Sequence, residues 1–394
     1  MTAIIAGYAR TPFCKINGQL ANFSAPELGA HAIKAALKRA GIEADKVERV
    51  IGGQVVQAGV GQNPARQSAV HAGIPLGVPA ITINSVCLSG AEAVAYATRL
   101  IESGEADVVV AVGQESMSQT PHAWVGSRQG KKYGDVNLVD TLQLDALTDA
   151  FLKITMGEAT EESTRKLGTT RQAQDLIAVD SHLRAEKFRA MVDQEIEPIE
   201  FTVRGKTTII STDDGIRPET SLEALAALKP TFASDGTITA ATSSPLTDGA
   251  AAVILVSEKY AAAKGIKGIA KVLAHSIVAG PDYSLNHQPA NAVKVAATKA
   301  GLSVSDLELF ELNEAFAAVS VASTEALGAH TDQVNIHGGA IAIGHPVGAS
   351  GARIVGHLAR SLAELGAGHK GAIGICGGGG QGVGIILESL GGNS

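Results

Sequence analysis

The chain has 394 residues, a net charge of −7 and only 4% aromatic residues. This length is too great for a single hydrophobic core, so two or three structural units are expected. The acidic balance, with no long basic run, argues against a nucleic-acid-binding surface, and no apolar run approaches the roughly 18 residues that span a membrane. Three cysteines are too few for a disulfide framework and favour a reducing, cytoplasmic location.

Strands and helices alternate over the first part of the chain. Residues 3–6 and 107–112 are apolar runs typical of strands, and a capping box at Ser24–Glu27 predicts a helix that ends at Gly41. Pro64 is expected in the first turn of a further helix. This alternation predicts an α/β fold with a mainly parallel sheet and helices on both of its faces.

The sequence changes character between about residues 119 and 246, where periodicity weakens and charged residues become denser. A long helix is expected over 170–192 within this stretch, and an apolar strand returns at 250–256. We interpret 119–246 as an insertion into the first α/β unit. After it, the alternation of strands and helices resumes and continues to the end of the chain.

An internal repeat relates the two ends of the sequence. The segment SGAEAVAYATRLIES, which begins at Ser89, resembles SGARIVGHLARSLAE, which begins at Ser350, an offset of 261 residues (350 minus 89). Two halves built on one α/β plan explain the repeat, and chance similarity between alanine-rich helices is the alternative. A two-fold relation between the halves would bring the strand-to-helix corners that hold Cys87 and His345 together.

Cys87 is expected in a turn between a strand at 81–84 and a helix that begins at Ser89. Ser89 and Glu92 have the spacing of a capping box. The positive end of the helix dipole would lower the pKa of a thiol at this place to roughly 3.5–7.5, and the thiolate is the nucleophilic form. The alternative is that Cys87 is a buried and inert side chain, as free cysteines commonly are.

Two glycine-rich stretches contain further candidates. His345 lies in GGAIAIGHPVGASG (338–351), where Pro346 and the glycines set it apart from a lone structural histidine. Cys376 begins CGGGGQG (376–382), whose unobstructed backbone N–H groups suit an oxyanion hole, with a tight turn as the alternative. Its G-x-G-x-x-G pattern is not a dinucleotide fingerprint, because a strand-like run rather than a helix follows it.

Asn313 begins NEAF (313–316) at a predicted junction between a strand and a helix. It could cap the helix, or it could hold a water molecule that points into a site. The sequence contains no C-x-x-C or H-x-x-x-H cluster, so we expect no metal site.

Together these motifs resemble the thiolase family. NSVCLSG around Cys87, NEAF, GGAIAIGHPVGASG and CGGGGQG occur in the family's order over essentially the whole chain, and GQNPAR (61–66) and GQESMSQTPH (113–122) add to the likeness. The resemblance implies a five-layered αβαβα fold of two similar halves with a loop domain inserted into the first. The implied units are an N-terminal half of residues 1–118 and 247–268, an inserted loop domain of residues 119–246, and a C-terminal half of residues 269–394.

The resemblance implies acyl transfer to and from coenzyme A. Cys87 would be acylated by one acyl-CoA, and His345 would activate it. Cys376 would act as general acid and base on the α-proton of the second acyl-CoA. Asn313 would hold a water molecule that, with His345, binds the enolate oxygen. The backbone N–H groups of Cys87 and Gly378 would form a second oxyanion hole, and each developing oxyanion would then meet preorganised donors.

By the same resemblance, coenzyme A would bind to the inserted domain, with Ser244 near its pantetheine and Arg217 near its adenine. Met156 and Phe316 would line the acyl pocket. The region 119–145 resembles a tetramerisation loop, which implies a homodimer or a homotetramer. Coenzyme A thioesters would be substrates, so no cofactor is expected.

Two departures from the acetoacetyl-making members concern acyl chain length. Thr155 stands where that type has histidine, and ATSSPLTDG (241–249) is closer to the degradative members. The smaller residue at 155 would open space in the acyl pocket and favour tolerance of longer acyl chains. NEAF rather than HDCF argues against the sterol-carrier type.

Three other functions are alternatives to a thiolase. A decarboxylating ketosynthase-like condensing enzyme is expected to have a second histidine where NEAF and Cys376 stand. A non-catalytic thiolase-like lipid-binding protein is expected to have lost a catalytic residue, and none is lost. A redox switch that pairs Cys87 with Cys376 could coexist with catalysis.

Overall fold

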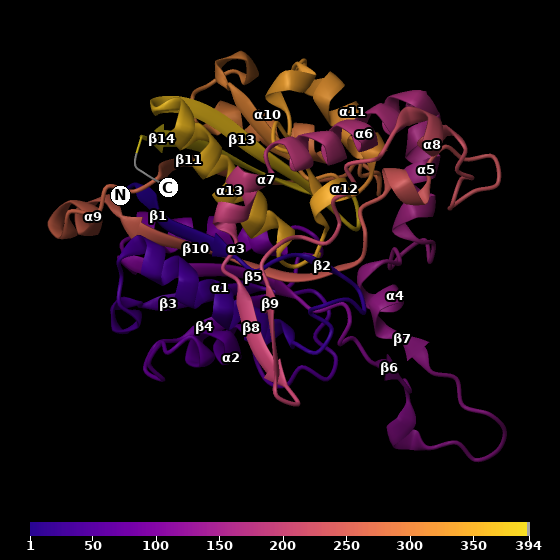
Figure 1. Ribbon diagram of the computed structural model, residues 1–394, viewed down its shortest axis with the longest axis horizontal. Helices are drawn as coiled ribbons and strands as arrows, with labels where there is room; N and C mark the ends of the chain where they lie inside the picture. The colour runs from indigo at the N-terminus through magenta and orange to yellow at the C-terminus, as the bar shows by residue number, and fades with distance from the viewer. Residues whose placement is uncertain (392–394) are drawn as a thin grey trace.

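A ten-stranded mixed sheet forms the centre of the computed structural model, which describes residues 1–391 (Figure 1). The C-terminal limit of the expected unit 269–394 therefore lies outside the described residues. A short strand, β2 (Cys14–Lys15), pairs with β10 beside the main path. The strands of the main path, in spatial order, are β12 (Leu309–Leu312), β13 (Ala367–Gly377), β14 (Gln381–Leu390), β11 (Ala270–Ala279), β1 (Ala3–Arg10), β10 (Thr247–Ser257), β5 (Val108–Glu115), β3 (Arg49–Gly53) and β4 (Ala80–Ile83).

The prediction of a mainly parallel sheet was wrong. Only β3 with β4, β3 with β5, and β12 with β13 pair in parallel, and the other pairs of the main sheet are antiparallel. The reason lies in the connections. β14 follows β13 through a tight turn and β10 follows the insertion, so neither strand is reached through the helical crossover that parallel pairing requires.

Helices cover the outer faces of the two halves and also fill the space between them. On the outside, α1 (Ala25–Ala40) packs on the N-terminal half and α10 (Gln288–Lys299) packs on the C-terminal half. Between them lie α3 (Ser89–Glu102) and α13 (Ser350–Leu365), which share one core with strands of both halves. This order of layers confirms the αβαβα arrangement. None of the helices within residues 1–391 is both long and apolar enough to cross a membrane.

Strand β10 shows how the sequence produces these layers. Its side chains alternate between the two sides of the sheet, because successive side chains of a strand point to opposite faces. Val253 and Leu255 belong to the core that contains α3 and α13, whereas Ile254 and Val256 belong to the core under α1. All eleven residues of the strand are buried, as expected for a sheet covered on both faces.

The two halves of the sheet join along a short seam. β1 pairs with β11 only from Ala3 to Ile5, opposite Ala270–Val272. A bulge between Ile5 and Gly7 follows at once in the pairing of β1 with β10. Beyond these three residue pairs, β1 and β11 separate. The two halves of the sheet then lie on opposite sides of the central helices α3 and α13, so a single hydrogen-bonded sheet forms two layers.

The two helices predicted from the internal repeat cross each other closely at their first turns. A Cβ atom on Gly90 would lie 2.7 Å from the backbone nitrogen of Ala352, and a Cβ atom on Gly351 would collide with the backbone nitrogen of Ala91. These contacts are reciprocal under the 261-residue offset, since Gly90 corresponds to Gly351 and Ala91 to Ala352. The structure therefore confirms that the repeated segments meet around a two-fold relation.

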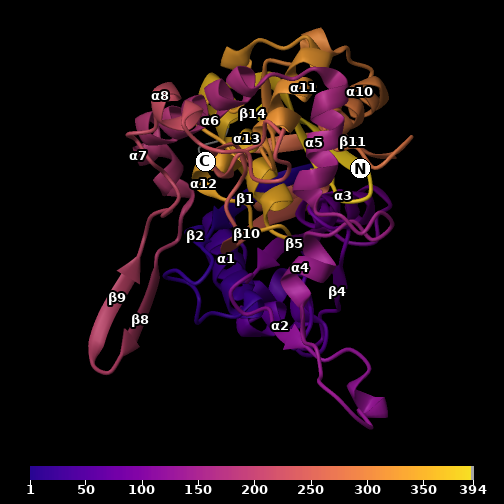
Figure 2. The ribbon, with the colours of Figure 1, turned by 90° about the vertical axis from the view of Figure 1, so that its right-hand side faces the viewer.

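The stretch 119–246 carries two projections from the body of the molecule (Figures 1 and 2). One is the loop around β6 (His122–Ala123) and β7 (Val139–Asp140), and the other is the hairpin of β8 (Ile199–Val203) and β9 (Lys206–Ile210). The helix expected over 170–192 is divided at Phe188 into α6 (Arg171–Lys187) and α7 (Arg189–Val192). The remaining helices of the chain are α2 (Pro64–His71), α4 (Thr141–Ala146), α5 (Met156–Leu167), α8 (Leu222–Ala226), α9 (Glu258–Lys264), α11 (Ala317–Leu327) and α12 (Ala340–Ile343).

Candidate active site

Six of the nine residues singled out from the sequence line one cavity of about 370 Å³. The cavity is largely apolar, and three of its wall residues are Met117, Leu147 and Phe232. Its lining comes from both halves and from the inserted stretch, which is why no single segment of the sequence reveals it. The six residues are Cys87, His345, Gly378, Ser244, Met156 and Phe316.

Cys87 lies in a tight turn just before α3, and the predicted capping box is wrong. The N-cap position of α3 is Leu88, which makes no side-chain capping bond. Ser89 Oγ instead donates to the carbonyl of Val86 at 2.6 Å and accepts from the backbone N–H of Ser85 at 2.9 Å. Ser89 therefore fixes the turn that presents Cys87, and Val86 adopts a positive φ of 52° within it. Cys87 is half-buried and lines the cavity, so it is not the fully buried cysteine of the alternative interpretation.

The Cys87 thiol is not ionised in the resting protein, contrary to the expectation from the helix dipole. Burial raises the pKa of Cys87 to about 12, and the Glu115 carboxylate adds to the rise. The backbone N–H groups of Cys87 and Gly378 act in the opposite direction and lower this pKa through hydrogen bonds to the sulfur. Because the rise dominates, the thiol needs a base to become a nucleophile.

His345 lines the same cavity as Cys87. Its ring Nδ1 lies 2.6 Å from Ser350 Oγ, and Ser350 Oγ donates its own proton to the carbonyl of Pro346 at 3.1 Å. We infer from this hydrogen-bond network that Nδ1 carries the ring proton and that Nε2 presents its lone pair. Nε2 is buried and has no hydrogen-bond partner among the described residues. Burial and the nearby Arg353 lower the pKa of His345 to about 4, so the ring is neutral at ordinary pH.

The lowered pKa of His345 predicts a pH dependence of stability. In the unfolded chain His345 takes up a proton as the pH falls below about 6.5, whereas in the folded protein it does so only near pH 4. The free energy of unfolding should therefore decrease as the pH falls from 6.5 to 4, with this group contributing up to about 3 kcal/mol of the change. Urea unfolding at pH 7, 6 and 5 measures it.

The matched control for that experiment is His345→Asn, whose side-chain amide can still donate to Ser350. The difference in unfolding free energy between wild type and variant isolates the contribution of the imidazole from that of other titrating groups. It should shrink as the pH falls below 6.5. A difference that stays constant from pH 7 to 5 would show that folding leaves the pKa of His345 unchanged.

Cys376 lies at the end of β13, buried against the apolar floor of the cavity. It is 1% exposed and packs in one cluster with Phe316 and Leu285. Burial raises the pKa of Cys376, and the Cys87 sulfur raises it further, which places the two sulfurs near each other. Cys376 is therefore a neutral thiol that can carry a proton into or out of the site.

The glycine-rich turn after Cys376 joins β13 to β14, as its strand-like continuation predicted. Gly379 and Gly380 have φ values of 79° and 69°, and a Cβ atom on Gly380 would collide with the carbonyl of Asp282. The turn is tight, as one interpretation of this motif expected. Gly378 lines the cavity, and its backbone N–H lowers the pKa of Cys87; its use as an oxyanion hole stays a prediction.

Asn313 is fully buried at the end of β12, and it does not line the cavity. Its backbone N–H donates to the carbonyl of Gly374 at 2.9 Å, while its side-chain Oδ1 and Nδ2 have no partner among the described residues. It does not cap a helix, since α11 begins at Ala317 with Phe316 as its N-cap. A buried amide without a protein partner is suited to hold a water molecule.

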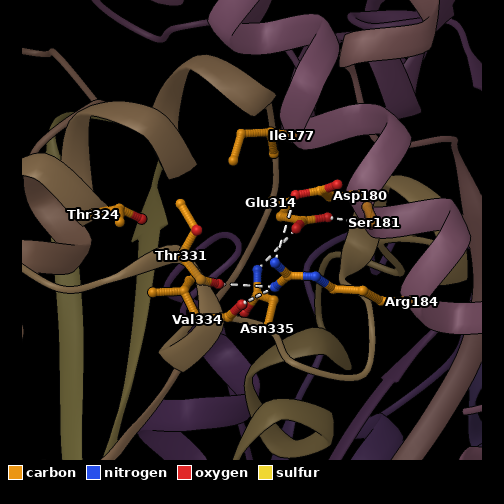
Figure 3. Close-up of a pocket in the computed structure, with 9 residues that line it drawn as sticks. All are labelled: Ile177, Asp180, Ser181, Arg184, Glu314, Thr324, Thr331, Val334 and Asn335. Atoms are coloured by element: carbon orange, nitrogen blue, oxygen red, sulfur yellow. Dashed lines mark hydrogen bonds and ion pairs between the residues drawn. The ribbon is translucent and has the colours of Figure 1, made fainter. Parts of the chain in front are cut away.

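The neighbouring Glu314 fixes the loop that leads to His345. Its buried carboxylate accepts from Ser181 Oγ at 2.7 Å, from Asn335 Nδ2 at 2.9 Å and from the N–H of Ile341 at 3.1 Å. Figure 3 shows this carboxylate between Ser181 and Asn335, with the Arg184 side chain reaching the carbonyls beside it. The contacts join α6 of the inserted stretch to α12 and so to the histidine loop.

Two supporting residues were not predicted from the sequence. Ser350 sets the tautomer of His345, and its position five residues after the histidine in a proline-containing turn was the available signal. Glu115, at the end of β5, accepts from the N–H groups of Val55, Val56 and Gly348, and so ties the loops of the two halves together. Burial raises the pKa of Glu115 to about 8. An acidic residue that ends a β-branched strand was the signal there.

The two residues expected near coenzyme A lie in different surroundings. Ser244 lines the cavity, and its hydroxyl donates to the carbonyl of Ala315 at 3.1 Å. Arg217 is exposed and does not line this cavity, and its backbone N–H donates to His182 Nδ1 at 3.1 Å. The structure thus brings Ser244 to the reacting groups and leaves Arg217 at the surface of the inserted stretch.

The fold and the site define a class of protein. A five-layered α/β sandwich presents a thiol, a neutral imidazole and a glycine-rich turn at Gly378 in one apolar cavity, an arrangement suited to covalent acyl transfer through a cysteine thioester. Family comparison agrees with this class. Residues 3–259 match the model of the thiolase N-terminal domain, and residues 266–389 match that of the thiolase C-terminal domain. The chain belongs to the thiolase family.

Individual relatives match over nearly the full length of the chain. A probable acetyl-CoA acetyltransferase of Mycolicibacterium smegmatis is 50% identical, with 98% of this chain and 100% of the relative covered. An acetyl-CoA acetyltransferase of Cupriavidus necator is 44% identical, with 98% of each chain covered. Among solved structures, a Bacillus anthracis acetyl-CoA acetyltransferase and human mitochondrial 3-ketoacyl-CoA thiolase have TM-scores of 0.95 and 0.94, each at 35% identity and 98% coverage of both chains.

Proposed function

We propose that this thiolase is an acyl-CoA C-acyltransferase that cleaves 3-ketoacyl-CoA with coenzyme A, or joins two acetyl-CoA molecules, through an acyl-Cys87 intermediate. The observation that carries the proposal is the neutral His345, whose unpartnered Nε2 shares a cavity with the Cys87 thiol. A steady-state assay with acetoacetyl-CoA and with longer 3-ketoacyl-CoAs tests it. Absence of thiolysis with every chain length would contradict it.

The first half-reaction forms the acyl-enzyme. His345 Nε2 takes the proton from Cys87 Sγ, and the sulfur attacks the keto carbon of the 3-ketoacyl-CoA. The bond between the α-carbon and the former keto carbon then breaks, and its electron pair forms the enolate of acetyl-CoA. His345 and the water held by Asn313 stabilise the enolate oxygen, and Cys376 gives its thiol proton to the α-carbon.

The second half-reaction releases the acyl group. A coenzyme A thiol gives its proton to the Cys376 thiolate left by the first half-reaction, and its sulfur attacks the carbonyl carbon of acyl-Cys87. The N–H groups of Cys87 and Gly378, both of which act on the Cys87 sulfur, would stabilise the oxyanion that forms. Collapse of this intermediate breaks the thioester bond, yields the shortened acyl-CoA and releases the Cys87 thiolate, which takes back its proton from protonated His345. Condensation follows the same steps in reverse.

The residues of the site favour a thiolase over a ketosynthase-like enzyme and over a non-catalytic lipid-binding protein. A ketosynthase-like enzyme would place a second histidine near Cys87, whereas the positions beside it hold Asn313 and Cys376. A non-catalytic lipid-binding protein would not need the neutral tautomer of His345 that Ser350 imposes. The apolar cavity itself does not separate these interpretations, because each of the three proteins would hold an acyl chain there.

Coenzyme A binding is proposed for the inserted stretch, with Ser244 at the pantetheine and Arg217 at the adenine. Met156 and Phe316 are proposed as walls of the acyl pocket. The division into 1–118 with 247–268, 119–246, and 269–394 is proposed as the domain structure on this basis. Acyl transfer through a thioester needs no redox or metal cofactor, so we propose that coenzyme A thioesters suffice.

We propose a homodimer or homotetramer in the cytoplasm. The loop around β6 and β7 carries exposed large side chains, among them Val125 (70% exposed) and Tyr133 (93% exposed), which an interface would cover. All three cysteines are free thiols, which suits a reducing compartment. Light scattering at micromolar concentration should give a molar mass of two or four chains, and the mass of a single chain would contradict the assembly.

Chain length gives a further prediction, because Thr155 lines the cavity together with Met156 and Phe316. Each additional methylene buried in an apolar pocket contributes about 0.8 kcal/mol, or roughly fourfold in binding. We expect kcat/KM to hold or rise from four-carbon to six-carbon 3-ketoacyl-CoA, and Thr155→His to narrow this range. A drop of about a hundredfold at six carbons in the wild type would show a closed pocket.

The Thr155 experiment needs a second variant, because Thr155 also caps α5. Its hydroxyl accepts from the Glu158 N–H at 3.2 Å and donates to the Glu158 carboxylate at 2.8 Å. Loss of such a cap costs about 1 kcal/mol of stability. Thr155→Ala removes the cap without filling the pocket. If the range of accepted acyl chain lengths narrows in Thr155→His but not in Thr155→Ala, the narrowing is a steric effect.

A further inference from the structure

A second cavity, of about 360 Å³, lies at the seam between the two halves and shares no residue with the cavity of Cys87. Its walls come from the bulged part of β1, the end of α1, the turn at 193–195, the start of β11, and α13. The cavity is located where β1 leaves β11 after Ile5, so the separation of the two sheet layers creates it. Its size is that of a small-molecule binding site.

Two guanidinium groups line this cavity, and one of them lacks a counter-ion. Arg360 is 4% exposed, and its Nη2 donates to Gln194 Oε1 at 3.2 Å. Its Nε and Nη1 have no hydrogen-bond partner among the described residues, and no ion pair of Arg360 with a carboxylate occurs within residues 1–391. A buried charge without a partner is costly, so a ligand that supplies negative charge here would be stabilised.

The second guanidinium belongs to Arg39 and increases the excess of positive charge. Its Nη1 donates to the carbonyls of Tyr8 and Glu195 at 3.2 and 3.1 Å, which holds the group at the cavity wall. Its Nη2 lies 3.7 Å from Oε2 of Glu197, and the Glu197 side chain is partly exposed. Burial lowers the pKa of Arg39, and the proximity of Arg360 lowers it further, so the two cations are close enough to repel each other.

The buried carboxylate of Glu195 lies nearby, but its hydrogen-bonding positions are occupied by other side chains. Glu195 accepts from Arg10 Nε at 3.1 Å and from His357 Nδ1 at 2.5 Å, and the Tyr8 hydroxyl donates to it at 3.3 Å. Among the described residues, neither guanidinium of the cavity therefore forms a direct ion pair with Glu195, and the partly exposed Glu197 is the carboxylate in contact with Arg39.

We propose that this seam cavity binds the phosphate group of a small phosphorylated metabolite. Guanidinium groups recognise phosphate oxygens through paired, charge-assisted hydrogen bonds, and a dianion matches two neighbouring cations better than a carboxylate monoanion does. The cavity is larger than a phosphate ion alone, and Ile269, Ala6 and Gly7 supply an apolar wall for an attached organic group. The site is separate from the one proposed for coenzyme A.

Inorganic phosphate is the probe for a direct test, with sodium chloride used to hold the ionic strength constant. The protein is saturated with coenzyme A beforehand, so that phosphate cannot report on the coenzyme A site. The δ1-methyl group of Ile269, assigned in methyl NMR spectra by Ile269→Leu, reports on the cavity wall. We expect a saturable shift of this signal in the wild type, and at least tenfold weaker binding in Arg360→Gln.

The controls separate the proposal from general charge effects. Arg99→Gln removes a partly exposed arginine of α3 that pairs with Glu92, and it should bind phosphate as the wild type does. Arg39→Gln serves as a second test variant should Arg360→Gln fail to fold. Thiolysis by these variants should be unchanged. An unshifted Ile269 signal, equal binding in wild type and Arg360→Gln, or an equal response to acetate would each overturn the phosphate site.

Discussion

Replacing Cys87 with alanine is expected to abolish thiolysis and condensation together, with kcat lowered by about 10⁴-fold or more. Both directions pass through the same thioester, so no other group can replace the sulfur. The fold should persist, because the turn before α3 is held by Ser89 and the backbone rather than by the thiol. Far-UV circular dichroism and the thermal midpoint check the fold, and initial rates in both directions check the effect.

Mass spectrometry after incubation with acetyl-CoA identifies the acylated residue. The wild type should gain one acetyl group on Cys87, and Cys87→Ala should gain none. Cys14 is an internal control, because it is fully buried and burial also raises its pKa. An acetyl group on Cys14 with none on Cys87 would remove Cys87 from the mechanism.

Replacing Cys376 with serine is expected to separate the two halves of the reaction. The hydroxyl is a far weaker acid than the thiol, so proton transfer at the α-carbon should slow by about 10²–10⁴-fold. Acylation of Cys87 by acetyl-CoA does not involve this proton and should change much less. Condensation rates, exchange of the α-proton with deuterated solvent, and single-turnover acylation measure the three quantities separately.

Cys376→Ala provides the comparison, since it removes the proton-carrying group and also leaves a small void in the cluster with Phe316. Acylation that survives in both variants assigns Cys376 to proton transfer. An equal loss of condensation, exchange and acylation would indicate that Cys376 only maintains the glycine-rich turn. In that outcome, another group of the site would have to transfer the α-proton.

The starts of several helices could be predicted from the sequence, because capping residues and prolines are local signals. The capping box at Ser24 and Glu27 is present as expected, and Pro64 is in the first turn of α2. The repeated segments at Ser89 and Ser350 became the crossing helices α3 and α13. The first two features depend on residues that lie within a few turns of one another along the chain, whereas the crossing was indicated by a repeat 261 residues apart (350 minus 89).

The ionisation states could not be predicted in this way, because they depend on burial. The position of Cys87 before a helix suggested a lowered pKa, yet the surrounding protein raises it. The same burial keeps His345 neutral, and only the structure shows that Ser350 decides which ring nitrogen has the proton. Strand direction was missed for a related reason, since β10 returns from a long insertion whose path the sequence does not reveal.

The hairpin of β8 and β9 was also missed, although its turn had a recognisable signal. Arg204 and Gly205 both have positive φ, 49° and 78°, which is the geometry of a type I′ hairpin turn. Apolar and polar residues alternate before the turn, in Ile199–Val203, but not after it, where residues 206–210 read KTTII. The pattern of the first strand together with a following glycine was therefore the available signal for the hairpin.

The crossing of α3 and α13 has a consequence for how the enzyme tolerates change. Cys87 is three residues before Gly90, and Ser350, which orients His345, directly precedes Gly351. The spacing between Cys87 and His345 is thus set by the closest approach of two helices rather than by flexible loops. A side chain added at Gly90 or Gly351 would push the two helices apart and displace both residues together. A single substitution at this crossing would therefore alter packing and the geometry of the cavity at the same time.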